Sequence, residues 1–287
     1  SAASLTYEEA GRAIDNATHE WHDVLSSLDR VGRSLRSKRL KAGALFLERP
    51  EMIIEVPASG KGEVRLVARS SSARQMVAEF MILFNSLMAE FCRREQIPAA
   101  YRSQLNPVFK DIEESVPEGP LRHYLMSRRL APAELNTTPS AHGGLGVASY
   151  IQATSPLRRY PDLTMQRQIS SFLDSGEPQY SQKEIASVAQ RAEVQLRELS
   201  RLEEYRRRYW FLKFLSERLD SGPNGLWEAV VLDNQARRPA LLELREYPFR
   251  FRAKLPPSEV AGAVVMLRLH GIDLWRRTAQ FIHSTVA

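Results

Sequence analysis

The chain has 287 residues, of which 43% are hydrophobic and 26% are charged, as in a soluble globular protein with one large and one small domain. Its 40 basic and 34 acidic residues give a net charge of +6, which is compatible with a polyanionic partner without requiring one. A single cysteine excludes an intramolecular disulfide, and neither a signal-peptide pattern nor roughly 20 continuous apolar residues occur, so we expect a cytoplasmic protein without a membrane partner.

The first predicted element is a helix that begins near Tyr7, because Thr6 and Glu9 have the spacing of a capping box. Apolar residues recur beyond it at helical intervals, at Ile14, Trp21, Val24, Leu28 and Val31. Residues 43–70 then read as two strands around a turn at residues 59–62. The imperfect alternation of the first strand is compatible with burial on both of its faces.

A long helix is predicted next, and either Ser71 or Ser72 can cap it. It must end before Pro98, because the residue before a proline avoids the helical conformation. Cys92 lies in the apolar run FMILFNSLMAEFC of this helix. That position favours a buried structural thiol over a reactive one.

Two further helices are predicted, one from Pro161 and one over residues 181–219. The composition shifts at residues 220–225, which read as a linker. Five short β-rich runs follow in about 65 residues, as in a small OB-type barrel. The predicted fold class is therefore α+β, with a large domain over residues 1–220 and a five-stranded β-barrel over residues 221–287.

The segment from Thr154 to Asp162, TSPLRRYPD, carries the most informative chemistry. Two hydroxyl side chains and two adjacent arginines, Arg158 and Arg159, precede a helix whose start is favoured by Pro161. Helix N-termini offer free N–H groups, and an arginine offers paired donors that match a phosphate. The segment therefore suits a phosphodiester. The alternative is that one arginine pairs with Asp162 and that the hydroxyl groups only cap the helix.

This segment resembles the signature of the ribonuclease II and ribonuclease R (RNB) family, whose core reads Thr-Ser-Pro-Ile/Leu-Arg-Arg-Tyr-x-Asp. His142, Leu145, Tyr150 and Gln152 lead into that core here, in keeping with the family pattern. The stretches LTYEEA, SLRSKRLKAGALFLERPE, VAEFMILFN and IPAAYRSQLNP are similar to the same family in the same order. The resemblance runs from about residue 5 to the end. It implies the C-terminal portion of an RNB-type catalytic domain followed by an OB-fold RNA-binding domain.

The resemblance implies a hydrolytic exoribonuclease that degrades single-stranded RNA from its 3′ end and releases nucleoside monophosphates. Such enzymes use two divalent metal ions, usually Mg²⁺, held by clustered aspartates. Arg158 is implied to contact the scissile phosphate and to stabilise charge in the transition state. Thr154, Ser155 and Arg159 are expected to contact RNA beside it, with Arg159 as a secondary phosphate contact or as the ion-pair partner of Asp162.

Three residues are implied to lie near the 3′-terminal nucleotide. Phe46 matches an aromatic that stacks on the terminal base, although a Phe in GALFLE is also a common core residue. Tyr7 matches a tyrosine near the terminal ribose, although it could be a simple helix-start residue. The family helix carries two consecutive glutamates where this chain has Ala78 and Glu79, so one acidic group is missing and Glu79 is expected to keep part of the role.

The aspartates of the chain are scattered, at positions 15, 23, 29, 111, 162, 174, 220, 233 and 273. In the family the metal-binding cluster lies upstream of the LTYEEA segment. We therefore predict no metal ligand in this chain and expect an upstream N-terminal polypeptide to supply the aspartates that hold Mg²⁺. Two alternatives stay open: a non-catalytic RNA-binding protein that retains the groove, and a scaffold whose basic surfaces bind protein.

The predicted barrel carries a second candidate RNA contact. On a strand, Tyr247, Phe249 and Phe251 would share one face, and Arg250 and Arg252 the other. The aromatics would stack on bases and the arginines would contact phosphates, or else Phe249 and Phe251 belong to the barrel core. From residue 222 onward, nine Lys/Arg and six Asp/Glu give a local charge of about +3, which favours weak, salt-sensitive RNA binding.

Overall fold

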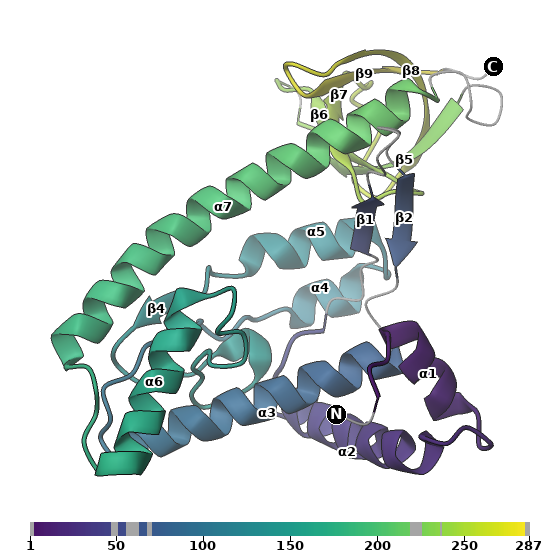
Figure 1. The fold of residues 1–287 in the computed structure, drawn as a ribbon. Coiled ribbons are helices and arrows are strands. Elements are labelled where there is room, and N and C mark those ends of the chain that lie inside the picture. Colours follow the sequence, from purple (N-terminus) through teal and green to yellow (C-terminus); the bar gives the residue numbers. More distant parts are fainter. Residues whose placement is uncertain are drawn as a thin grey trace. The chain divides into compact units, whose positions relative to one another are not determined.

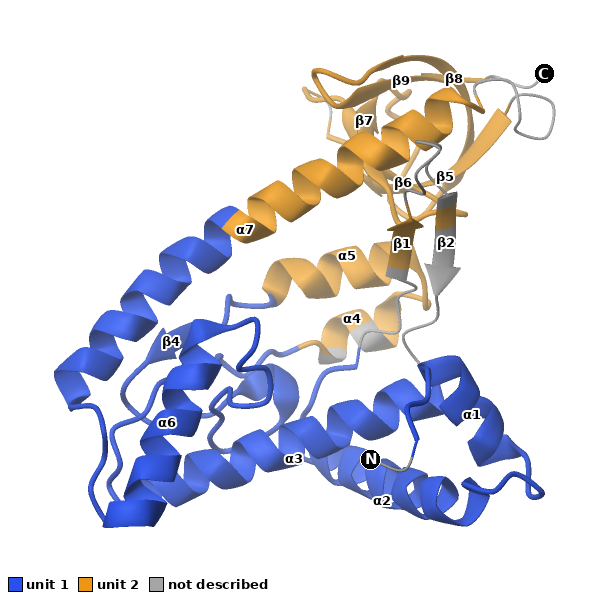
Figure 2. Cartoon of the chain, viewed as in Figure 1, with its two compact units in different colours: residues 1–48, 69–108, 130–198 blue, residues 49–68, 109–129, 199–287 orange. Residues whose placement is uncertain are grey.

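The computed structural model describes residues 3–46, 51–55, 63–67, 71–218, 226–235 and 237–284 (Figure 1). The chain divides into two compact units, which Figure 2 colours separately. Unit 1 comprises residues 1–48, 69–108 and 130–198, and unit 2 comprises residues 49–68, 109–129 and 199–287. The predicted turn at residues 59–62 and the predicted linker at residues 220–225 lie outside the described residues.

Unit 1 contains the helices α1 (Tyr7–Asp15), α2 (His22–Lys41) and α3 (Ser72–Arg94), which pack against one another. The predicted capping box forms, since the side chain of Thr6 accepts from the Glu9 N–H at 3.2 Å and that of Glu9 accepts from the Thr6 N–H at 2.7 Å. The helical periodicity that runs through Val31 is divided between two helices, because residues 16–21 separate α1 from α2.

The buried face of α2 is polar, contrary to its apolar periodicity. Gly32 faces α3 so closely that a Cβ there would lie 3.2 Å from the Cα of Met76. Asp29 is buried as well, and its carboxylate pairs with Arg33 at 2.6 Å. A close backbone approach at Gly32 therefore brings α2 and α3 together, the Asp29–Arg33 ion pair lies within α2, and exposed side chains remain at Val24, Leu28 and Val31.

By length and composition alone, α3 could span a membrane. It nevertheless packs against α1 and α2 and buries Glu79 and Asn85, as a core helix does. It ends before Pro98, as predicted. Cys92 is fully buried near its end, and burial raises the pKa of the thiol to about 12. The expected structural thiol is confirmed.

The remainder of unit 1 joins β3 (Tyr101–Ser103), antiparallel to β4 (Glu134–Asn136), with the short 3-10 helix η1 (Gly143–Leu145) and α6 (Tyr160–Ser175). The first half of α7 (Gln182–Ser216) also belongs to it. These elements share a core with the end of α3, in which the large buried side chains include Ile97, Ile151, Met165 and Ile185.

Unit 2 is built around a five-stranded antiparallel sheet with the strand order β7-β6-β5-β8-β9. The rings of Phe251 on β7 and Phe281 on β9 lie 4.2 Å apart between centroids, so the two edge strands meet and the barrel is nearly closed. The predicted α+β fold with a small five-stranded barrel is therefore confirmed. The strands are β5 (Leu226–Asp233), β6 (Ala240–Leu244), β7 (Arg250–Ala253), β8 (Val264–Asp273) and β9 (Thr278–His283).

The second half of α7 covers the barrel core with Phe211, Leu212 and Leu215, all fully buried. The short helices α4 (Lys110–Ser115) and α5 (Pro120–Arg129) also lie in unit 2, where Tyr124 packs with Val230 and Leu232. The hairpin of β1 (Glu51–Glu55) and β2 (Glu63–Val67) packs against the same core through half-buried side chains at Met52, Ile54 and Val64. Met52, Ile53 and Ile54 are all half-buried, so both faces of β1 are partly covered and neither is fully buried at these residues.

Candidate functional site

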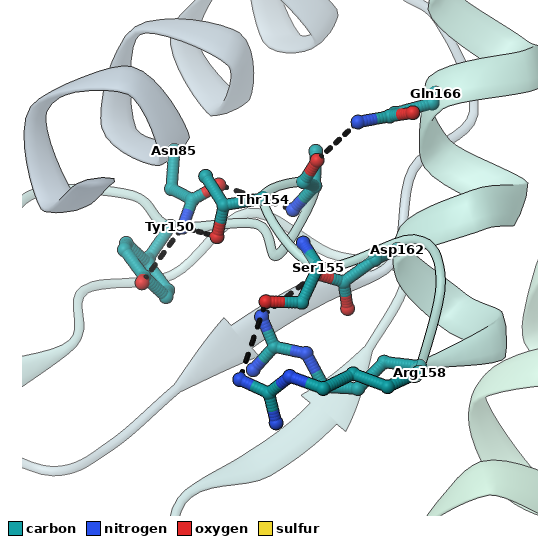
Figure 3. A network of polar contacts seen from close by, with 9 residues as sticks. Asn85, Tyr150, Thr154, Ser155, Arg158, Asp162 and Gln166 are labelled. Atoms are coloured by element: carbon teal, nitrogen blue, oxygen red, sulfur yellow. Dashed lines mark hydrogen bonds and ion pairs between the residues drawn. The ribbon is translucent and has the colours of Figure 1, made fainter. Parts of the chain in front are cut away.

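The predicted signature forms a short loop, residues 154–159, that leads into α6 (Figure 3). The backbone N–H groups of Arg158 and Arg159 both donate to the carbonyl of Ser155, at 3.3 and 3.0 Å. α6 begins directly after this turn, with Pro161 in its first turn as predicted. The loop is thus a compact turn at the N-terminus of a helix.

Asp162 holds the loop from the side of α6. Its carboxylate is buried, and one oxygen accepts from the Ser155 N–H at 2.9 Å and from the Arg159 guanidinium at 2.7 Å (Figure 3). Arg159 is therefore the ion-pair partner of Asp162, which was one of the two roles expected for it. Since this pair fixes Arg159 within the loop, the arginine that faces solvent is Arg158.

Arg158 is exposed, and its guanidinium donates to the Ser155 hydroxyl at 3.3 Å. No carboxylate pairs with it among the described residues, in contrast to its neighbour Arg159. Leu157, just before it, is wholly exposed. A guanidinium without a partner charge on a fixed backbone has the geometry that phosphate binding requires.

Asn85 on α3 holds the loop from the other side. Its buried side chain accepts from the Ala153 N–H at 3.0 Å and donates to the Tyr150 hydroxyl at 2.9 Å and to the Thr154 hydroxyl at 3.4 Å. Gln166 donates to the Ala153 carbonyl at 2.7 Å, so side chains take both backbone groups of that residue (Figure 3). The sequence alone did not lead us to Asn85 or Gln166. The one sign of Asn85 was that it is a single amide side chain within an apolar run.

Tyr150 packs edge-on against His142, with ring centroids 5.7 Å apart. Burial raises the pKa of Tyr150. Burial, together with the positive charge of Arg102, lowers the pKa of His142 to about 4. Both rings are therefore neutral near pH 7, and they support the segment before the loop without supplying a charged acid or base.

Glu79 does not lie on the loop. It is 2% exposed, and both of its carboxylate oxygens accept from the guanidinium of Arg39, one of them at 2.8 Å. Arg39 also donates to the Leu145 carbonyl at 2.7 Å, which ties α2 and α3 to the segment around η1. Glu79 is six residues from Asn85 on α3, or about 9 Å along the helix axis. Helix α3 thus carries both Glu79, which pairs with Arg39, and Asn85, which holds the loop.

The two aromatic candidates each lie against an arginine. The guanidinium carbon of Arg36 is 3.7 Å from the Phe46 ring centroid, and that of Arg74 is 4.5 Å from the Tyr7 ring centroid. Phe46 is half-buried and Tyr7 is exposed, so each ring keeps accessible surface. Among the described residues, no ring contact joins either side chain to Arg158; Phe46 lies against Arg36 of α2, and Tyr7 lies against Arg74 at the start of α3.

Arg250 and Arg252 lie on β7 in unit 2. Phe249 and Phe251 are 4% and 3% exposed, so the alternative that they belong to the barrel core is correct. The Arg250 guanidinium donates to the buried carboxylate of Glu243 at 2.7 Å, whereas Arg252 is exposed and donates to a backbone carbonyl at 2.9 Å. Arg252 is the more accessible cation of the two.

The described residues do not fit the two-metal site that the resemblance implies. No group of three or more His, Cys, Asp or Glu side chains is placed to hold a metal ion in the ranges that the structure describes. Asp162, the acidic residue nearest the loop, is engaged by Arg159 and by the Ser155 N–H. Several carboxylates converging on the ions would be needed.

Residues 1–175 match the family model described as the RNB domain. The chain is 34% identical over 264 residues to an uncharacterised ribonuclease of Synechocystis sp., and the aligned part makes up 89% of this chain and 39% of that protein. It is 32% identical over 275 residues to a chloroplastic/mitochondrial ribonuclease II of Arabidopsis thaliana, covering 92% of this chain and 33% of that protein. The chain therefore spans well under half the length of these relatives.

Solved structures share the fold. An active-site mutant of the Dss1 exoribonuclease from Candida glabrata aligns with 99% of this chain and 38% of its own, with a TM-score of 0.85 and 20% identity. Yeast Ssd1, a pseudonuclease, aligns with 94% of this chain and 38% of its own, with a TM-score of 0.61 and 14% identity. The same fold thus occurs in an exoribonuclease and in a pseudonuclease.

Proposed function

This chain belongs to the RNB family of exoribonucleases, and we propose that it supplies the phosphate-gripping part of an enzyme that hydrolyses single-stranded RNA from its 3′ end to nucleoside monophosphates. Nucleases of this family are metal-dependent. We assign the ions, as Mg²⁺, to an aspartate cluster on a polypeptide segment upstream of this chain, because the described residues do not form such a cluster. The proposed site of action is the cytoplasm.

The observation that carries the proposal is the exposed guanidinium of Arg158 on a loop held from both sides. Hydrolysis of a phosphodiester builds up negative charge on the phosphate oxygens in the transition state. A guanidinium offers two parallel N–H donors to such oxygens and stabilises that charge. Because Asn85 and Asp162 already fix the backbone, little conformational freedom is lost when the phosphate arrives.

The other loop residues position Arg158. Ser155 is hydrogen-bonded to the Arg158 guanidinium through its hydroxyl and to Asp162 through its backbone N–H. Thr154 is tied to Asn85, and Arg159 neutralises the buried Asp162. In this proposal Arg159 contacts RNA from the rim of the loop while its charge is shared with Asp162, and the hydroxyls of Thr154 and Ser155 lie next to the bound backbone.

The 3′-terminal nucleotide is assigned to the region of α1, α2 and α3. Phe46 would stack on the terminal base with the part of its ring surface that Arg36 leaves open. The exposed Tyr7 would place its hydroxyl at the ribose. Glu79 would act indirectly: its carboxylate holds Arg39 in place and does not itself contact the nucleotide. Arg250 and Arg252 remain proposed phosphate contacts on the barrel.

The test uses the complete enzyme, that is, this chain together with the aspartate-bearing segment. Arg158→Ala should lower the single-turnover rate on end-labelled single-stranded RNA by about 100- to 1000-fold, as expected when a charge-stabilising donor is lost. Its RNA affinity, measured by filter binding, should change little. Arg167→Ala is the matched control, because Arg167 is an exposed arginine on α6, the helix that follows the loop of Arg158.

Equal losses of turnover and affinity would reassign Arg158 to simple RNA binding. An unchanged rate would refute the proposed role altogether. The alternative function is RNA binding without hydrolysis, and what supports it is that yeast Ssd1, a pseudonuclease, has a similar fold. It predicts that RNA stays intact when Mg²⁺ and the upstream segment are both present, although it is bound in a salt-sensitive way.

A further inference from the structure

Two arginines lie against the two rings to which the 3′-terminal nucleotide is assigned. The guanidinium carbon of Arg36 is 3.7 Å from the Phe46 ring centroid. That of Arg74 is 4.5 Å from the Tyr7 ring centroid. The Arg36 guanidinium also donates to the Gln75 side chain at 2.6 Å, and Gln75 directly follows Arg74 on α3. These contacts therefore connect both rings to the first turn of α3, within unit 1.

Arg74 carries a positive charge with which no carboxylate forms an ion pair among the described residues. Glu79, the nearest acidic residue on α3, is buried, and both of its carboxylate oxygens accept from Arg39. Glu9, two residues after Tyr7, is engaged in the capping box at the start of α1. The cation beside Tyr7 is therefore available to an anionic ligand.

The residue one turn further along α3 adds no charge of its own. Ala78 follows Arg74 by four residues, so the two lie on the same face of the helix, and Ala78 is exposed. An acidic side chain at that position would be an i, i+4 partner of Arg74 and would neutralise part of its charge. Arg74 also lies in the first turn of α3, where the helix dipole adds positive potential. The alanine therefore leaves the charge of Arg74 for a ligand.

A guanidinium beside the terminal ribose matches a phosphate ester on that ribose. In the proposed function the Tyr7 hydroxyl lies at the ribose of the last nucleotide, so a group attached to this ribose lies next to Arg74. A phosphate on the 3′ oxygen carries about −1.5 to −2 charges at pH 7 and offers three acceptor oxygens. A 3′-hydroxyl is uncharged, so it forms a much weaker contact with an arginine.

We propose that the site of the 3′-terminal nucleotide accepts RNA that ends in a 3′-phosphate, and that Arg74 binds this phosphate. The inference rests on the proposed function and names the chemical class of RNA end that the same site takes.

Hydrolysis of such a strand occurs at the same bond as in ordinary RNA. Water attacks the phosphorus atom between the last two nucleotides, and the bond from this phosphorus to the 3′ oxygen of the penultimate nucleotide breaks. That oxygen takes up a proton from the attacking water. The first product is therefore a nucleoside 3′,5′-bisphosphate, and the shortened strand ends in an ordinary 3′-hydroxyl.

The experiment compares 5′-labelled oligonucleotides that end in a 3′-phosphate, a 2′,3′-cyclic phosphate or a 3′-hydroxyl. Their affinity for the full chain is measured by fluorescence anisotropy in EDTA, which prevents hydrolysis. The 3′-phosphate should bind about five- to thirtyfold more tightly than the 3′-hydroxyl, as expected for a charge-assisted pair with arginine. The cyclic phosphate, with a single negative charge, should lie between the two. The preference should decrease as the salt concentration rises.

Three variants test the assignment to Arg74. Arg74→Gln should reduce the preference to less than about twofold, whereas Arg74→Lys should keep at least about threefold, because an ammonium still binds phosphate as a point charge. Ala78→Glu supplies a carboxylate that pairs with Arg74 and repels the phosphate, so the 3′-hydroxyl end should then bind at least as well. Arg93→Gln is the matched control, since Arg93 is an exposed arginine at the far end of α3, and it should leave the preference unchanged.

Equal affinity of the unaltered chain for the 3′-phosphate and 3′-hydroxyl ends would overturn the inference. The same holds if Arg74→Gln, shown to be folded by thermal unfolding, keeps the wild-type preference. In the complete enzyme, a 3′-phosphorylated strand should release one nucleoside 3′,5′-bisphosphate and then monophosphates, and normal turnover of 3′-hydroxyl RNA without any bisphosphate from the phosphorylated strand would also overturn it. Each of these results leaves the proposed function intact, because that function needs only a 3′-hydroxyl end. If the unaltered chain bound none of the three oligonucleotides, the inference and the proposed function would both fail.

Discussion

Replacement of Asn85 by alanine tests whether the clamp on the signature loop is both structural and functional. The change leaves the N–H of the buried Ala153 without its acceptor, at a cost of about 1–3 kcal/mol. It also removes the donor to the Tyr150 and Thr154 hydroxyls, a loss of about 0.5–1.5 kcal/mol for a hydrogen bond between neutral groups. We therefore expect the free energy of unfolding to fall by about 2–4 kcal/mol.

The same variant should lose activity under conditions in which it is still folded. Asn85 fixes the backbone just before the turn that carries Arg158, so its loss releases the guanidinium from a single orientation. In the complete enzyme, kcat should fall by more than KM rises, because a misplaced guanidinium affects the transition state more than the bound substrate.

Urea denaturation and single-turnover kinetics provide the two readouts. Leu87→Ala is the matched control on α3, since this side chain is 54% exposed and its loss should change the free energy of unfolding by less than about 0.5 kcal/mol. Tyr150→Phe, which removes one of the Asn85 contacts, should cost about 1 kcal/mol. The reasoning is refuted if Asn85→Ala is no less stable than Leu87→Ala, or if it is destabilised but retains the full single-turnover rate.

Two further predictions concern the supports of the site. Gly146→Ala should lower the free energy of unfolding by about 2–5 kcal/mol, because φ is 64° and the new Cβ would lie 2.7 Å from the Arg39 carbonyl oxygen. Gly176→Ala is the control, since its φ is 79° but no atom lies within 4 Å of the new Cβ, and it should cost about 1–2 kcal/mol. Equal losses of the two variants in urea denaturation would contradict this prediction. The lowered pKa of His142, about 4, stabilises the fold above the unfolded-state pKa of about 6.5, and this stabilisation is lost as the pH falls from 6.5 to 4. The contribution should be about 1–2 kcal/mol smaller at pH 5 than at pH 7, and an identical pH dependence in His142→Gln would exclude this residue as the cause.

Features that depend on neighbouring residues could be predicted from the sequence. The turn and helix start around Pro161 follow from the local stereochemistry of proline and from the capping positions. The capping box of Thr6 and Glu9 is local in the same sense. The five strands of the barrel were visible as β-rich runs because each is short and is bounded by turn residues.

Features that depend on distant pairings could not be predicted in this way. Asn85 reaches a backbone group 68 residues away, and no spacing rule connects the two positions. A period of two shows which side chains share a strand face but not which face lies inside, so Phe249 and Phe251 could be assigned to the core only once the barrel was seen to close. The buried face of α2 was misjudged because Gly32, which has no side chain to contribute to an apolar pattern, makes the contact.

Cys92 is the only thiol in the sequence, and it is fully buried with a pKa near 12, so maleimide reagents should leave it unmodified at neutral pH while the protein is folded. Leu157, by contrast, projects wholly into solvent from the turn next to Arg158. A Leu157→Cys chain would therefore accept one fluorophore at the tip of the loop with no need to remove the native cysteine. Stopped-flow emission from that dye would time the arrival of an RNA strand at the turn separately from its cleavage.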